Sequence, residues 1–436
     1  MPPPRPLLIA EAANPEWVSV PLVGWSHARA LLEACPGAHL VTQVRNRDAI
    51  VRAGLVDGKD FTAIDSEAVA RRMHQVSQLL RGKSGVSWTT STALQTLAYP
   101  YFEKLVWQRF EQAIRGHEFN VVHRITPLSP TTPSLIAREV RDAGVPFVLG
   151  PLNGGVPWPK GFDAERRRER EWLSYVRDGY KLLPGYRSTR EAAAAILIGS
   201  RDTWKQVPEV YRSKCFYVPE NAIEPTRFRK RRCRTALLPI RGIFIGRLVP
   251  YKGADMLLEA ALPLLRDGRM TLDVVGDGPQ MPHLREMVAR EKIEHAVTLA
   301  GWVQHDQVQD RLIEADVLPF PSIREFGGGV ALEAMAVGVV PIVPDYGGLG
   351  ELVSPQTGFL LEMGSRAQII TRLRDVLVRL ADQPGLIEPK SLAAHRRAHE
   401  QFTWAAKAQQ TVSIYQWVLG QRKNRPQFPM PTPDLI

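Results

Sequence analysis

The sequence predicts an α/β protein built from two Rossmann-like, doubly wound domains. Three observations support this: the length of 436 residues, the alternation of short apolar runs with runs of helical period, and a break in that alternation near mid-chain. The length exceeds what one compact core normally supports and suits two domains. Alternating strand-like and helix-like runs are typical of βαβ units, which form parallel sheets.

The alternation is clearest in the second half of the chain. Expected strands there cover 242–246, 270–275, 296–300, 316–320 and 339–343, and expected helices cover 254–265, 281–291 and 306–314. In the first half, expected strands cover 7–10, 39–44, 119–123, 145–149 and 195–198, and expected helices cover 66–80, 93–115 and 132–143. Both halves therefore predict the same architecture.

A basic run, Arg227–Arg234, and the proline that follows it at Pro239 interrupt the pattern, so we place the interdomain linker there. The predicted domains are 1–235 and 236–403. The final segment, 404–436, is expected to hold a helix that packs back on the N-terminal domain and a proline-rich tail.

Composition excludes several classes of protein. Hydrophobic residues make up 44% and charged residues 23%, which excludes a disordered, collagen-like or coiled-coil chain. The three cysteines form no CxxC pair and suit a reducing cytosol. No apolar run approaches the roughly 20 residues that span a bilayer. The net charge of +11 predicts an anionic partner: phosphate, nucleic acid or anionic lipid.

One loop combines the features of an anion-binding site. A strand is expected to end at Phe320, three glycines follow at 327–329, and a helix is expected to begin near Val330. Glycines let a phosphate approach the backbone amides, and a helix N-terminus adds partial positive charge. In open α/β sheets ligands bind beyond the carboxyl ends of the strands, where this loop lies.

Two carboxylates flank these glycines, Glu325 before them and Glu333 about one turn into the helix. Because a carboxylate repels a phosphate, we expect both to bind hydroxyl groups such as those of a sugar or ribose. The alternative is that Glu333 forms a surface ion pair and Glu325 is a loop charge. Spacing alone does not decide between the two interpretations.

Two cations follow the first strand of the second domain, Arg247 and Lys252 within GRLVPYKG (246–253). Such a pair suits a charge-assisted clamp on a diphosphate, although an arginine taken singly is more often part of a structural ion pair. A second glycine turn, VVGDGP (274–279), lacks the third glycine of a dinucleotide fingerprint.

Five loop motifs in order, GRLVPYKG, VVGDGP, Gly-Trp-Val (301–303), PSIREFGGGVALEAMAVG (321–338) and Asp-Tyr-Gly-Gly (345–348) with Glu351, resemble those of retaining glycosyltransferases of the GT-B fold, family 4, known as glycosyl transferases group 1. The resemblance covers about 242–359. It implies two domains facing a central cleft, with the nucleotide-sugar donor on the C-terminal domain and the acceptor on the N-terminal one. The implied enzyme is a hexosyltransferase.

The resemblance also implies residue roles. Arg247 and Lys252 would neutralise the diphosphate, Glu325 would contact the donor sugar, and Glu333 would hold the ribose hydroxyls. Further donor contacts would come from Gly246, Gly276, Val303, Phe326, Gly327, Gly328, Gly329 and Val330. The family usually reads Glu-Gly-Phe-Gly where this chain has Glu325-Phe326-Gly327-Gly328, so the individual amide contacts differ.

The first half resembles the family less closely. His123, in VVHRITPLSP, matches a strand-end histidine that faces the cleft and is the candidate catalytic histidine, although a lone histidine is more often structural. Candidate acceptor-binding residues are Asn153, Gly154 and Gly155, for which a simple turn is the alternative. Gly24 is a further candidate, because it is the single glycine where the family has a two-glycine loop after the first strand.

The resemblance implies a donor substrate and no cofactor or metal. The expected partners are a nucleotide sugar and a glycan or lipid-linked acceptor in polysaccharide or glycoconjugate biosynthesis. The expected location is the cytoplasm, with peripheral contact at the inner face of an anionic membrane through Arg227–Arg234 and Arg166–Arg170, unless these clusters are simply solvated faces.

Three other functions stay open. A GT-B sugar-nucleotide epimerase or a sugar-phosphate synthase would use the same donor site. A basic nucleic-acid-binding protein would fit the charge, but it leaves the Glu-x7-Glu loop unexplained, and we therefore expect no nucleic-acid partner.

Overall fold

The computed structural model describes residues 2–67, 88–154, 156–159, 161–162, 181, 184–232, 237–304 and 307–428. The chain divides into two compact units. Unit 1 comprises Met1–Gly155, Arg170–Glu220 and Trp404–Ile436, and unit 2 comprises Val156–Glu169 and Asn221–Thr403. The main segment of unit 2 thus begins at Asn221, ahead of the basic run where the sequence places the linker. Most of the expected helix over 66–80 and the cluster Arg166–Arg170 lie outside the described residues.

Unit 1 is built on a parallel sheet of seven described strands. These are β1 (Pro6–Ala10), β2 (His39–Gln43), β3 (Phe61–Ile64), β4 (Val121–Thr126), β5 (Phe147–Leu152), β6 (Ala193–Ile198) and β7 (Cys215–Tyr217). Their spatial order is β3-β2-β1-β4-β5-β6-β7, and every pair is parallel. The order 3-2-1-4-5-6 is that of a Rossmann fold.

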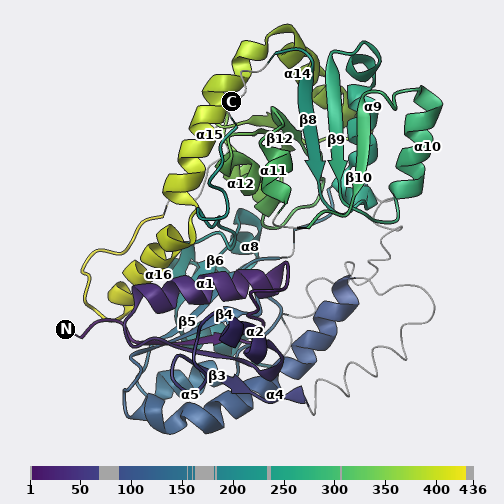
Figure 1. The fold of residues 1–436 in the computed structure, drawn as a ribbon. Helices are drawn as coiled ribbons and strands as arrows, with labels where there is room; N and C mark the ends of the chain where they lie inside the picture. Colours follow the sequence, from purple (N-terminus) through teal and green to yellow (C-terminus); the bar gives the residue numbers. More distant parts are fainter. Residues whose placement is uncertain are drawn as a thin grey trace. The chain divides into compact units, whose positions relative to one another are not determined.

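Helices cover this sheet and supply its core. They are α1 (Val20–Ala34), α2 (Arg47–Arg52), α4 (Trp88–Arg115), α5 (Ile136–Asp142), α7 (Tyr186–Ala192), α8 (Arg201–Gln206) and α16 (Trp404–Val418), with 3₁₀ turns at η1 (Val44–Asn46) and η4 (Glu209–Lys214). The C-terminal helix α16 lies beside α1 (Figure 1). The last helix of the chain is therefore part of the first unit.

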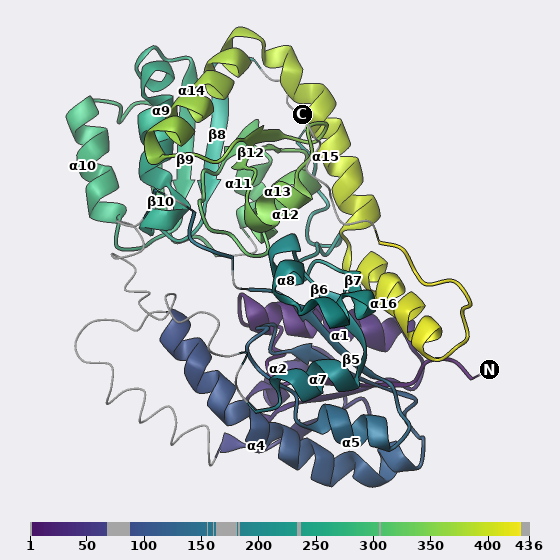
Figure 2. The same cartoon turned by 180° about the vertical axis from the view of Figure 1, so that it is seen from behind.

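Unit 2 repeats the architecture with six described strands. They are β8 (Ile240–Ile245), β9 (Met270–Val275), β10 (Val297–Gly301), β11 (Val317–Pro319), β12 (Val340–Pro344) and β13 (Phe359–Leu361), in the order β10-β9-β8-β11-β12-β13. The helices are η5 (Pro250–Lys252), α9 (Ala254–Arg266), α10 (Met281–Glu291), α11 (Val308–Leu312), α12 (Gly329–Ala336), α13 (Gly347–Leu352), α14 (Arg366–Asp382), η6 (Pro384–Leu386) and α15 (Ile387–Gln401). Helices α12 and α15 pack together (Figure 2).

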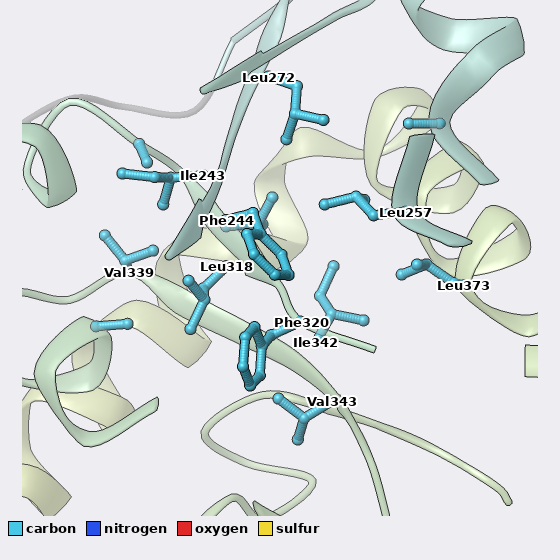
Figure 3. Packing of buried hydrophobic residues seen from close by; sticks show 14 of the residues in the cluster. Ile243, Phe244, Leu257, Leu272, Leu318, Phe320, Val339, Ile342, Val343 and Leu373 are labelled. Atoms are coloured by element: carbon cyan, nitrogen blue, oxygen red, sulfur yellow. The ribbon is translucent and has the colours of Figure 1, made fainter. Parts of the chain in front are cut away.

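A continuous apolar core fixes the position of the loops in unit 2. Phe244 on β8 and Phe320 just after β11 lie with ring centroids 5.2 Å apart, and Leu257 of α9 and Leu373 of α14 cover the same strands (Figure 3). All four side chains are buried. Because the core holds the strand ends rigidly, the loops that follow them start from fixed positions.

The predicted fold class is confirmed: both units are parallel, Rossmann-like α/β domains, as in GT-B proteins. Each expected strand is present within a few residues of its predicted bounds. The sequence missed β3, β7 and β13, and each of these is an edge strand of three or four residues. Such strands are too short to give a clear periodic signal. Among the described residues, no helix is both long enough and apolar enough to span a membrane.

Candidate functional site

The candidate site is formed by the loops that leave the carboxyl ends of the unit 2 strands. Strand β8 leads into η5, which carries Lys252, and β11 leads through the glycine loop into α12. Gly328 is the N-cap residue of α12 and has a φ of 61°. Because glycine has no side chain, it does not cap the amides in the first turn of the helix. Backbone amides at the start of α12 are therefore placed where an anion can be bound.

The structure brings three predicted site residues together at this edge. The Lys252 ammonium forms an ion pair with the Glu325 carboxylate, and both side chains are largely buried. Arg247 is exposed, and its Nη2 donates to the hydroxyl of Tyr251, 2.6 Å away. Since Tyr251 immediately precedes Lys252, the two cations flank one aromatic residue. Arg247 thus donates to a hydroxyl group and not to the carboxylate of a structural ion pair.

Glu333 lies on α12, and the pKa of its carboxyl group is strongly shifted. Desolvation raises the pKa of its carboxyl group to about 7, and the positive charge of Arg227 acts in the opposite direction. A carboxylate shifted toward neutrality by burial is typical of functional sites. The sequence assigned Arg227 to the linker, and nothing in its spacing from Glu333 pointed to this proximity.

Two glycines of the loop motifs, Gly276 and Gly348, allow neighbouring strand-end loops to come into backbone contact. A Cβ on Gly276 would lie 1.9 Å from the carbonyl oxygen of Gly246, and one on Gly348 would lie 2.1 Å from that of Phe326. The amide of Gly348 donates to the carbonyl of Glu325 at 3.1 Å. The glycines at 276 and 348 are therefore required by backbone contact between adjacent strand-end loops.

The remaining predicted donor contacts lie in the same loops with varied exposure. Gly329 has open space apart from the Asn221 side chain, 3.7 Å from a Cβ placed there. Val303 and Val330 are partly buried against the core, and Phe326 and Gly327 are partly buried beside Glu325. These positions are compatible with a ligand but do not assign individual contacts.

Sequence reasoning missed a group of residues around Arg324. The guanidinium carbon of Arg324 lies 5.1 Å from the ring centroid of Trp158 and 5.1 Å from that of Phe326. The Trp158 ring meets Tyr251 edge-on, with centroids 6.2 Å apart. The acceptor prediction named Asn153, Gly154 and Gly155, and the residues that follow them, 156–159, belong to unit 2. A tryptophan between two prolines was the only local signal.

His123 lies inside unit 1, and the expectation that it ends its strand is wrong. Strand β4 continues to Thr126, so His123 is its third residue and is completely buried. Its Nε2 and Nδ1 each lie 2.5 Å from a partner, the Gly150 carbonyl and the Tyr415 hydroxyl respectively. A carbonyl only accepts, so Nε2 donates and Nδ1 accepts from Tyr415.

Burial lowers the pKa of His123 to about 4, so the ring is neutral at physiological pH. The lone pair that a general base would use is already engaged by Tyr415. This geometry matches the structural alternative, and a catalytic role for His123 stays a prediction.

The predicted acceptor residue Asn153 is buried in a polar network of unit 1. Its amide nitrogen donates to Glu220 at 2.5 Å, and its side-chain oxygen accepts from the Gly154 amide at 2.8 Å and from Ser200 at 3.1 Å. These bonds join the loops after β5, β6 and β7. Asn153 therefore fixes the shape of this loop edge, and acceptor contacts by Asn153 and Gly154 stay predictions. Gly155 lies outside the described residues.

Gly24 lies within helix α1, and our expectation that it occupies a strand-end loop is wrong. A Cβ there would lie 2.1 Å from the carbonyl oxygen of Ala12. The glycine is thus explained by the close approach of α1 to the loop after β1, and an acceptor contact by Gly24 is not needed to account for it.

Three cations of the basic run are tied into unit 2 by acidic partners. Arg232 is buried and pairs with the buried Asp316 at 2.6 Å, Arg231 pairs with Glu388 at 3.4 Å, and Lys230 pairs with Asp310 at 2.5 Å. These cations are part of the second domain and not of a free linker. Among the described residues, no cluster of three or more His, Cys, Asp or Glu could hold a metal ion.

Comparison with known proteins gives the class that this fold and site define. Residues 239–379, which carry most of the site, match the family model described as Glycosyl transferases group 1. The resemblance of this region to glycosyltransferases is therefore confirmed.

Individual relatives agree with that class. The chain is 32% identical over 219 residues to the glycogen synthase of Mycobacterium tuberculosis, covering 49% of this chain and 51% of that protein. It is 34% identical over 200 residues to the D-inositol 3-phosphate glycosyltransferase of Streptomyces griseus, covering 44% and 41% respectively. The chain spans about half the length of the curated relatives that it matches.

Solved structures match nearly the whole chain at low identity and support the fold. A glycosyltransferase of Rickettsia africae aligns with a TM-score of 0.62 at 14% identity, covering 96% of this chain and all of that one. The sucrose-phosphate synthase of Thermosynechococcus elongatus aligns with a TM-score of 0.60 at 16% identity and the same coverage. Anabaena HepE, solved in complex with UDP and glucose, aligns with a TM-score of 0.54 at 13% identity, covering 93% and 98%.

Proposed function

We propose that this protein is a retaining glycosyltransferase that moves a sugar from a nucleoside diphosphate sugar to a glycan or lipid-linked acceptor. The observation that carries the proposal is the meeting of Arg247, Lys252 and Glu325 beside the start of α12. Two cations and a helix N-terminus suit a diphosphate, and the flanking carboxylates suit sugar hydroxyls. The relatives named above support a sugar-transfer reaction.

Catalysis in this proposal is stabilisation of the leaving group. When the bond between the sugar and the diphosphate breaks, negative charge grows on the departing diphosphate. Arg247, Lys252 and the amides at the start of α12 offset that charge without a metal ion. The acceptor hydroxyl attacks from the face that the diphosphate leaves and passes its proton to the departing phosphate oxygen, so the anomeric configuration is kept.

In this proposal, donor binding changes the partners of both Lys252 and Glu325, which form an ion pair in the structure. An entering diphosphate competes with Glu325 for the Lys252 ammonium. The released carboxylate then becomes available to accept hydrogen bonds from the sugar hydroxyls. Binding of the two halves of the donor is thereby linked through one pair of side chains.

The test is a binding and transfer panel on the full chain. UDP-glucose, UDP-N-acetylglucosamine, GDP-mannose and ADP-glucose are each assayed by thermal shift and calorimetry, because a ligand that binds the folded state raises its Tm. Arg247→Ala should lower the affinity for the donor by about tenfold or more, since a charge-assisted hydrogen bond contributes roughly 1.5–3 kcal/mol. The matched control is Arg266→Ala, a surface arginine paired with Glu291.

The outcomes separate this function from the alternatives. Sugar transfer with retained configuration, read by NMR of the product, supports the proposal. Conversion of the nucleotide sugar without any acceptor would indicate an epimerase, and a sugar-phosphate product would indicate a synthase. Failure of all four donors to bind would contradict the proposed function.

Membrane contact at the cytoplasmic face is a separate part of the proposal. Since Lys230, Arg231 and Arg232 have acidic partners, this part rests chiefly on the cluster Arg166–Arg170. Flotation with anionic liposomes should then be lost when these arginines are replaced by glutamine and should weaken with salt. Equal flotation of the wild type with neutral and anionic liposomes would contradict it.

A further inference from the structure

The segment Val156–Pro159 packs on the loops of the candidate site. Val156 is only 1% exposed, and Phe162, a few residues later, is 1% exposed in the core of unit 2. The hydroxyl of Tyr346 donates to the carbonyl of Pro157 at 2.9 Å. The segment is therefore anchored at both ends and along its length by unit 2.

Arg324 is the residue through which this segment reaches the glycine loop. Its Nε donates to the Val156 carbonyl at 3.3 Å, and its guanidinium carbon lies 5.1 Å from the ring centroids of both Trp158 and Phe326. A guanidinium at this distance from the face of an aromatic ring is attracted to it electrostatically. Three contacts thus hold one side chain.

Arg324 immediately precedes Glu325, so its placement limits that of the carboxylate. The Ser322 hydroxyl donates to the Arg324 carbonyl at 3.4 Å, and the Glu325 carbonyl accepts from the Gly348 amide at 3.1 Å. With the backbone held on both sides and Arg324 held by Trp158, the Glu325 side chain has a restricted approach to Lys252.

We propose that Trp158 and Arg324 are positioning residues that hold Glu325 in place for the sugar half of the donor. This inference rests on the proposed function. Neither residue is required to contact the diphosphate, which the cations and α12 bind. Loosening the stack therefore weakens recognition of the sugar while leaving recognition of the nucleoside diphosphate nearly unchanged.

The experiment compares two ligands on the same variants. The tightest-binding nucleotide sugar of the four-donor panel and its own nucleoside diphosphate are titrated into wild type, Trp158→Ala and Arg324→Ala. Each variant should bind the nucleotide sugar roughly tenfold more weakly, the loss expected from about 1.4 kcal/mol of stacking. Binding of the nucleoside diphosphate should change by less than about twofold.

Conservative variants keep the test decisive where alanine disturbs folding. Trp158→Phe retains a ring and should recover most of the sugar affinity, whereas Arg324→Lys keeps the charge but loses the planar stack and should recover little. The control is Trp17→Ala, an exposed tryptophan of unit 1. It should bind both ligands as the wild type does.

Three results bear on the proposal in different ways. The inference is overturned, while the proposed function stands, if three variants all bind the nucleotide sugar as tightly as the wild type does. These variants are Trp158→Ala, Trp158→Phe and Arg324→Lys. Equal loss of both ligands in Trp158→Ala would also overturn it, because the stack would then support the whole loop edge. Absence of any donor binding by the wild type would instead overturn the proposed function on which the inference rests.

Discussion

Glu333 carries a carboxyl group that titrates in the physiological range, since burial raises its pKa to about 7. A carboxylate accepts hydrogen bonds from ribose hydroxyls better than the protonated acid does. If only the ionised form binds, lowering the pH from 8 to 6 should weaken nucleotide-sugar binding about tenfold. Calorimetry with a nucleotide sugar measures this, because its diphosphate is esterified at both ends and carries no terminal phosphate that titrates near pH 6.

The control for this pH dependence is Glu333→Gln. The variant should bind the donor more weakly at pH 8 and show a flat profile between pH 6 and 8. An equal slope in wild type and variant would assign the titration to another group.

His123 predicts a loss of stability in mild acid. Its folded-state pKa of about 4 lies below the ordinary value of 6.5. Between these values the unfolded chain binds a proton that the folded chain does not, so the free energy of unfolding falls as the pH drops from 6.5 toward 4. One such group contributes roughly 2 kcal/mol between pH 6.5 and 5.

Urea unfolding of wild type and His123→Gln at pH 6.5 and pH 5 measures this contribution to the free energy of unfolding. Glutamine can donate to the Gly150 carbonyl but does not titrate, so the difference between the two proteins should shrink as the pH falls. His27, whose pKa burial also lowers, contributes in the same direction in both proteins, and only the smaller part of its shift that comes from His123 differs between them. A constant difference across this range would show that His123 is not buried as a neutral group.

The sequence predicted which residues of unit 2 form the site better than it predicted those of unit 1. Arg247, Lys252 and Glu325 were recognisable because each follows a strand in a motif with fixed spacing. Trp158 and Arg227 were not, because they reach the site from segments that are distant in sequence. His123 was recognisable from its motif, but β4 continues to Thr126 and so places His123 in the interior of unit 1.

Among the elements, the strand-end loops of unit 2 depend on glycines that tolerate no side chain. A Cβ on Gly348 would lie 2.1 Å from the carbonyl oxygen of Phe326, so Gly348→Ala should displace the loop that carries Glu325. Overpacking of this kind costs roughly 1–3 kcal/mol. We expect a lower Tm together with weaker nucleotide-sugar binding.

Gly385→Ala is the matched control for this substitution. Gly385 has no heavy atom within 4 Å of a Cβ placed there and has no positive φ. It should leave both Tm and donor affinity close to the wild-type values. If Gly348→Ala behaved in the same way, the loop contact would not be needed for donor binding.

Element type was predictable wherever a run was long and periodic. Helices α9 and α10 and strand β9 match their expected bounds to within a residue. The three edge strands were missed because pairing with a neighbour, and not local sequence, defines a strand of three or four residues. Gly24 was assigned to a loop because its packing against Ala12 is a tertiary contact.

At the scale of the whole molecule, the net charge of +11 divides into separate groups. Arg247 and Lys252 serve the candidate site, whereas Lys230, Arg231 and Arg232 are neutralised by carboxylates within unit 2. Sequence alone could not make this division, because the acidic partners lie about 80 residues or more further along the chain. Net charge is therefore a poor guide to membrane or nucleic-acid binding here.

The chain passes between the two units beside a buried polar network of unit 1. Asn153 lies just before the crossing at 155/156, Glu220 is the last residue before the crossing at 220/221, and Lys407 lies just after the crossing at 403/404. Glu220 accepts from Asn153 and raises the pKa of Lys407, but desolvation outweighs it and lowers that pKa to about 7. Lys407 is only 2% exposed. The stability of the segments next to the crossings should therefore depend on pH.

The sign of this dependence follows from the lowered pKa of Lys407. Between about pH 7 and the ordinary value of 10.5, the unfolded chain binds a proton that the folded chain does not, so stability from this group rises with pH. From pH 7 to 9.5 the contribution approaches roughly 3 kcal/mol. Urea unfolding of wild type and Lys407→Met over this range isolates it, because other groups titrate equally in both proteins. Lys205→Met, at an exposed lysine of α8, should follow the wild-type profile. If Lys407→Met followed it as well, Lys407 would be charged and solvated in the folded protein.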